Sequence, residues 1–139
     1  MTRRVATVVW GSMLLLPFLF MGVVATARWG AARPETTAFL FWLTLAASAF
    51  NIALSRVLPP RLGPVGAGRE ATAFTRLVVG WALCEAAALF PLVAWIVTGD
   101  ARLLGVFAVD LLALVTLFPS DARWDALAEP PRPAARSTR

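Results

Sequence analysis

The sequence predicts an all-α integral membrane protein: a four-helix bundle made of two helical hairpins. Three observations lead to this prediction. Apolar residues make up 59% of the 139-residue chain and charged residues 15%, whereas a soluble domain is nearer half apolar and about a quarter charged. The mean hydropathy is +0.73. Four apolar runs follow one another, and arginines are concentrated at their ends, as is typical of multi-pass membrane proteins.

A membrane-spanning helix needs about 20 mostly apolar residues. Four segments meet or approach this length, the last being the shortest: about 5–27, 37–58, 74–98 and 102–119. Helices buried in a soluble domain are a poor alternative, because four such runs leave almost no polar surface to cover them. We expect one transmembrane domain over residues 1–129 and a disordered, Pro- and Arg-rich tail at 130–139.

The connections predict the pairing of the helices. Short loops at 28–36 and 98–101 tie the first helix to the second and the third to the fourth, whereas the Pro- and Gly-rich segment 59–73 separates the two pairs. The first and third runs contain the similar sequences VVWG and VVGW. This similarity fits duplication of a two-helix unit and equally fits chance similarity between apolar helices.

The arginines predict the orientation. If the N-terminus is inside, ten of the thirteen basic residues lie on the cytoplasmic side, and the other side has Arg28, Arg33 and Arg102. The positive-inside rule therefore predicts a multi-pass protein of the inner (cytoplasmic) membrane with both termini cytoplasmic. The exclusive use of Arg is typical of a GC-rich, bacterial genome. The N-terminus also resembles a secretory signal, but its apolar run is longer than the usual core of about 7–15 residues, so we expect it to stay uncleaved.

The composition excludes several kinds of site. The chain has no His and one Cys, which excludes internal disulfides, histidine or multi-cysteine metal sites and His-dependent nucleophilic catalysis. No nucleotide-binding motif is present, so we expect neither an enzyme nor a cofactor. The arginines form no basic stripe on a soluble domain, which argues against nucleic-acid binding. The expected partners are the lipid bilayer and a second membrane protein or another copy of the chain.

Glu85 is the first candidate functional residue, because it lies near the middle of the third run. An ionised acid at that depth costs about 2.5–3.5 kcal/mol on insertion scales. We therefore expect Glu85 to be protonated at neutral pH or paired, and to be a candidate proton- or ion-binding residue. Its neighbour Cys84 belongs to a small-residue stripe with Gly80 and Ala88, which predicts close packing against another helix.

The second run carries a polar stripe that is a candidate partner for Glu85. Its members recur at helical spacing on one face: Thr44, Ser48, Asn51 and Ser55. Polar residues on one face of a membrane helix are expected to face other helices rather than lipid. Because Ser48 lies at about the depth of Glu85, we predict that the stripe faces this acid.

Asp110, in the fourth run, is the second candidate proton- or ion-binding residue. Folding the last hairpin places it about one helical turn from the depth of Glu85, roughly 6–8 Å along the axis. Pro91 leaves the carbonyl of Ala87 without its helical donor. A protonated Asp110 is expected to donate to that carbonyl.

Residues 76–93, RLVVGWALCEAAALFPLV, resemble the carboxylate-bearing helix of the proteolipid c subunits of rotary ATPases. The match is carried by these positions: Ala82, Leu83, Glu85, Ala86, Ala88, Leu92 and Val93. The resemblance covers this one helix. It implies that Glu85 is the proton- or cation-binding acid. Four-span proteolipids made of two hairpins exist in the same family, which agrees with the suspected duplication.

Two functional hypotheses follow. In the first, the chain is a structural or accessory subunit or a partner-binding membrane protein, and its buried polar groups hold helices together. In the second, it is a proton- or ion-coupled channel, transporter or proteolipid-like subunit that uses Glu85, because ionisable residues inside membranes are commonly functional. An intramembrane enzyme is disfavoured, because Glu85 lacks a recognisable catalytic partner.

Overall fold

A computed structural model describes residues 3–26, 33–64 and 68–129. These residues form helices and no strands, which confirms the all-α prediction. The helices are α1 (Arg3–Thr26), α2 (Pro34–Arg61), α3 (Arg69–Thr98), α4 (Arg102–Val115) and α5 (Asp121–Ala128). The predicted disordered tail at 130–139 lies outside the described residues.

Three of the helices in the described part of the chain, α1, α2 and α3, are long and apolar enough to cross a membrane. This supports the prediction of a membrane protein. The fourth predicted span, 102–119, is not confirmed as a spanning helix. α4 has 14 residues, about 21 Å of helix, against a hydrocarbon core of about 30 Å. After α4 the chain continues through a turn and a short non-helical segment to α5.

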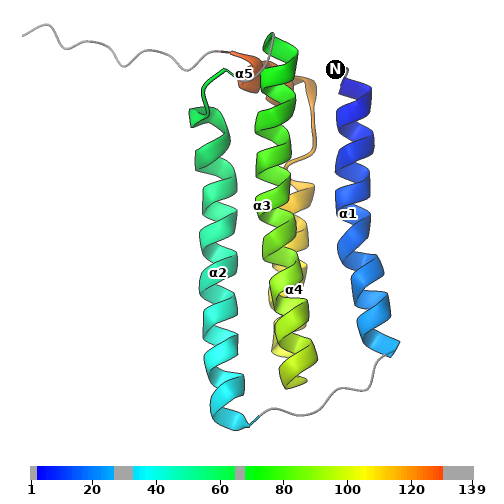
Figure 1. The fold of residues 1–139 in the computed structure, drawn as a ribbon, viewed down its shortest axis with the longest axis vertical. Helices are drawn as coiled ribbons and strands as arrows, with labels where there is room; N and C mark the ends of the chain where they lie inside the picture. Colours follow the sequence, from blue (N-terminus) through cyan, green and yellow to red (C-terminus); the bar gives the residue numbers. More distant parts are fainter. Residues whose placement is uncertain (1–2, 27–32, 65–67, 130–139) are drawn as a thin grey trace, which may run out of the picture.

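α3 is the central helix of the bundle. Figure 1 shows α1 and α2 on opposite sides of α3, with α4 behind it and α5 across the end of the bundle where the chain begins. α3 packs against each of the other four helices, whereas α1 and α2 have almost no contact with each other. The expected first hairpin is therefore not a packed pair. α3 and α4 do form an antiparallel pair, so α4 runs parallel to α2 (Figure 1).

The helix ends follow local sequence signals. Pro34 opens α2, where its missing N–H costs no hydrogen bond. Gly99 follows the end of α3, adopts φ 67° and donates its N–H to the Trp95 carbonyl at 2.7 Å; glycine takes this left-handed conformation without steric cost. The Ser120 hydroxyl caps α5 by accepting from the Arg123 N–H.

The predicted loop 59–73 is shorter than expected, because both of its ends are helical. α2 continues through Pro59 and Pro60 to Arg61, and α3 begins at Arg69. Each of these prolines removes one N–H donor from the last turn of α2. Pro59 is buried, near the position where a Gly80 side chain would lie.

The interior is built around α3. One apolar cluster joins Leu77, Trp81 and Cys84 to Leu114 and Leu117, and a second joins α3 to Phe107 and Leu111 of α4. Half of the most apolar window of α3 is buried, but only 11% of the corresponding windows of α1 and α2. The outer helices thus expose broad apolar surfaces, which need lipid or another protein to cover them.

Candidate functional site

Asp110 lies at a contact between the parallel helices α2 and α4. Its carboxylate is fully buried, and the Ser48 hydroxyl donates to Oδ2 at 2.9 Å. The other oxygen, Oδ1, is buried and has no hydrogen-bond partner in the described part of the chain. A buried carboxylate with one contact from a neutral hydroxyl is poorly compensated as an anion. The site therefore favours the protonated acid or a bound cation.

Thr44 adds a second unpartnered polar atom on the same face of α2. It precedes Ser48 by one turn, it is fully buried, and its Oγ1 has no partner among the described residues. A cavity of about 350 Å³ lies between α2 and α4, lined by Ser48, Asp110 and apolar side chains. Ser48 and Asp110 thus form a polar contact between the two helices in apolar surroundings.

Glu85 occupies a different position. It is the seventeenth of the thirty residues of α3, so it lies close to the middle of the longest helix. Its side chain is partly exposed, between the exposed Ala82 and Ala86. No hydrogen bond or ion pair joins Glu85 to another residue that the structure describes. Among the described residues Glu85 thus stays unpaired, on an apolar outer face halfway along a helix that is long and apolar enough to cross a membrane.

The prediction that the polar stripe of α2 faces Glu85 is wrong. Ser48 binds Asp110, and the Ser55 hydroxyl accepts from Cys84 Sγ at 3.3 Å. Asn51 donates to its own helix, at the carbonyl of Ala47. Adjacent helical residues point about 100° apart. Because Cys84 faces α2, the next residue, Glu85, is turned away from it.

The predicted small-residue stripe of α3 is buried as expected. Gly80, Cys84 and Ala88 all lie inside the bundle. A Cβ at Gly80 would lie 3.4 Å from the Ser55 carbonyl oxygen of α2, in van der Waals contact, so the small residues of α3 pack closely against α2. The hydrogen bond expected from Asp110 to the carbonyl of Ala87 is not seen, because Asp110 points towards α2 and contacts Ser48.

Side chains from three other helices bind the carbonyl groups at the end of α4. The last carbonyls of any helix lack helical donors, and in a membrane they must be satisfied within the protein. Here the Leu114 carbonyl accepts from the Trp10 indole at 3.2 Å and the Leu117 carbonyl from the Trp81 indole at 2.9 Å. Arg56 donates to the Ala113 carbonyl at 3.3 Å and to the Thr116 hydroxyl, and Arg3 donates to the Pro119 carbonyl. These contacts allow α4 to end inside the bundle.

Arg76 performs a similar role for α5. The residue is 1% exposed. Its guanidinium donates twice to the Leu62 carbonyl, at 2.6 and 3.2 Å, and once each to the carbonyls of Leu127 and Glu129, at 2.6 and 2.8 Å. Arg76 therefore joins the end of α2 and the end of α5 to α3.

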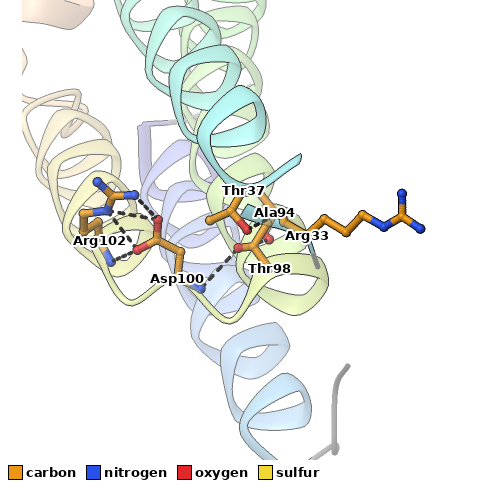
Figure 2. A network of polar contacts seen from close by, with 6 residues as sticks. All are labelled: Arg33, Thr37, Ala94, Thr98, Asp100 and Arg102. Atoms are coloured by element: carbon orange, nitrogen blue, oxygen red, sulfur yellow. Dashed lines mark hydrogen bonds and ion pairs between the residues drawn. The ribbon is translucent and has the colours of Figure 1, made fainter. Parts of the chain in front are cut away.

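The turn between α3 and α4 has its own polar network. Asp100 accepts from the Arg102 backbone N–H and from the Arg102 guanidinium (Figure 2). The shortest of these contacts is 2.7 Å. These hydrogen bonds hold the pKa of the Asp100 carboxyl below its ordinary value. The Arg102 guanidinium also lies 4.6 Å from the centre of the Phe41 ring, a cation–π contact that ties the start of α4 to α2.

Sequence reasoning treated Arg3, Arg56 and Arg76 as orientation signals and missed their contacts with backbone carbonyls. The sequence offered one signal for such contacts, the position of Trp81 and Arg76 inside a predicted apolar helix, where a buried donor needs an acceptor.

Compared with known protein families, characterised proteins and solved structures, the chain has no match.

Proposed function

We propose that this chain is a multi-pass protein of the inner membrane that acts as a structural or accessory subunit by binding a partner helix through Glu85. In this arrangement α1, α2 and α3 cross the bilayer, and α4 with the segment after it completes a fourth crossing. Both termini and α5 lie on the cytoplasmic side, where the positive-inside rule puts the arginine-rich ends.

The observation that carries the proposal is the Glu85 carboxyl, which has no partner in the part of the chain that the structure describes. A polar group facing lipid at this depth is costly, and a helix that offers it a donor or acceptor removes that cost. The neighbouring exposed positions, Ala82 and Ala86, are small enough to let a partner backbone come close. The apolar surfaces of α1 and α2 give such a partner further area to cover.

Two substitutions at Glu85 test this proposal. Glu85→Gln keeps a group that hydrogen-bonds, so association is expected to stay within about twofold of the wild type. Glu85→Leu removes it, and a membrane hydrogen bond of about 0.6–1.7 kcal/mol corresponds to roughly three- to twentyfold weaker association.

The measurement combines energy transfer between labelled copies in vesicles with photo-crosslinking from position 86 in native membranes. Glu35→Leu makes the same chemical change at an exposed position at the start of α2 and is expected to have no effect. The proposal is refuted if the wild type shows no self-association and no adduct. It is also refuted if an adduct forms and Glu85→Leu leaves it unchanged.

A second candidate function is proton or ion coupling, in which Glu85 titrates, as the resemblance to proteolipid c subunits implies, and Asp110 or Asn51 assists. The observation that favours it is the buried Asp110 Oδ1, which lacks a hydrogen-bond partner in the described part of the chain. This oxygen provides an acceptor for a proton or a small cation. Under this hypothesis Glu85→Gln gives a folded chain that no longer moves protons in a vesicle pH assay.

A further inference from the structure

A cavity of about 230 Å³ lies where α5 crosses α2 and α3. Its polar lining includes the guanidinium-bearing residues Arg56, Arg76 and Arg123, one from each of the three helices. Most of the remaining wall is apolar and includes Pro59, Trp81 and Leu127. The cavity therefore combines concentrated positive charge with an apolar surface.

The positive charge is not neutralised within the described residues. Arg76 is used on backbone carbonyls, which carry no net charge. Arg56 uses one amino group on the end of α4, and no ion pair joins Arg56, Arg76 or Arg123 to a described carboxylate. Asp121 of α5 is engaged with Arg3.

Arg123 is the least satisfied of the three. Its Nη1 is buried and has no hydrogen-bond partner among the described residues. Burial and the neighbouring charge of Arg56 lower the pKa of the Arg123 guanidinium. The surroundings of Arg123 thus disfavour its charged form. An anion between Arg56 and Arg123 would compensate both positive charges.

The chemistry of the anion follows from the donors and the wall. Guanidinium groups bind phosphate through paired N–H donors. Basic pockets between membrane helices on the cytoplasmic side bind phospholipid head groups. An apolar wall beside the charges suits the glycerol and acyl part of a lipid better than a free ion.

We propose that the cavity binds a phosphate group, carried by an acidic phospholipid, between Arg56 and Arg123. The lipid's apolar part lies along Pro59, Trp81 and Leu127. Bound lipid would then join α5 to the ends of α2 and α3. This site lies at the end of the bundle and is independent of the partner contact at Glu85.

The test is native mass spectrometry of the full chain in detergent. The probes are phosphatidylglycerol and phosphatidylcholine with identical acyl chains, with inorganic phosphate as a competitor. We expect phosphatidylglycerol to bind at least tenfold more tightly than phosphatidylcholine. Arg123→Gln should weaken phosphatidylglycerol about tenfold, because a charge-assisted hydrogen bond is worth about 1.5 kcal/mol or more. Arg61→Gln, an equal loss of charge at an exposed position outside the cavity, should change it less than twofold.

Three results would overturn the proposal. Equal weakening by Arg123→Gln and Arg61→Gln would mean attraction to general surface charge. Equal binding of the two lipids would mean that the site does not recognise the negative charge of the phosphoglycerol head group. Inorganic phosphate that competes at millimolar concentration in an Arg123-dependent way would assign the site to a free anion. If circular dichroism shows Arg123→Gln to be misfolded, Arg123→Lys replaces it, because lysine keeps the charge but loses the paired donors. Arg123→Lys should bind phosphatidylglycerol severalfold more weakly than the wild type. Unchanged binding would refute the assignment.

Discussion

Replacing Arg76 with methionine tests whether a buried arginine holds α5 on the bundle. Methionine keeps an unbranched chain of similar length and removes all four hydrogen bonds to the carbonyls of Leu62, Leu127 and Glu129. At about 1.5 kcal/mol for each hydrogen bond from a charged group, the upper limit is roughly 6 kcal/mol. Water can reach part of this end, and the variant no longer buries a charge, so we expect a net loss of about 3 kcal/mol.

The assay is equilibrium unfolding in mixed micelles, together with limited trypsin digestion. Loss of the Arg76 contacts should release α5 and make the bond after Arg123 susceptible to trypsin before the rest of the chain unfolds. Arg69→Met is the matched control, because Arg69 is exposed and lies two turns earlier on the same helix. Stability within 1 kcal/mol of the wild type and unchanged resistance of α5 in Arg76→Met would refute the reasoning.

Three further predictions concern other contacts of the bundle. Ser48→Ala removes the hydrogen bond to the buried Asp110 and should lower the free energy of unfolding by about 1–3 kcal/mol; Asp110→Leu in the same background should recover part of that loss. Trp81→Phe removes the indole donor to the end of α4 and leaves a small void, so we expect a loss of about 2 kcal/mol in the same unfolding assay. Asp100 has a folded-state pKa below its ordinary value of 3.8 because Arg102 donates to it. Its contribution to the free energy of unfolding is therefore present above pH 3.8 and is lost as the pH falls below that value. Thermal unfolding of Asp100→Asn over this pH range should show a smaller fall in stability than that of the wild type.

The helical class and the three long helices could be predicted from composition, because only helices satisfy the backbone of such long apolar runs in a membrane. The length of α4 could not. Residues 102–119 read as one apolar run, yet the helix ends at Val115. The donors that make this end possible, Trp10 and Arg56, are distant in sequence. The local sequence of residues 102–119 does not indicate which distant side chains donate to the carbonyls at the end of α4.

The candidate site was predicted in part for a similar reason. The polar face of α2 could be recognised by its helical spacing, and Ser48 does meet a buried acid. That acid is Asp110 rather than Glu85, because depth along a helix does not determine rotation about its axis. Rotation follows from packing, and here the close approach at Gly80 and Cys84 turns Glu85 outward.

The measurement that most directly tests the role of Glu85 is its labelling by dicyclohexylcarbodiimide, which modifies protonated carboxyls in apolar surroundings. Peptide mass spectrometry would compare native membranes with purified chain that light scattering shows to be monomeric. If a partner helix covers Glu85, the residue is labelled in the monomer and protected in native membranes, while the fully buried Asp110 stays unlabelled in both. Equal labelling of Glu85 in both samples, falling as the pH rises, would contradict the partner contact and indicate an open, titrating acid.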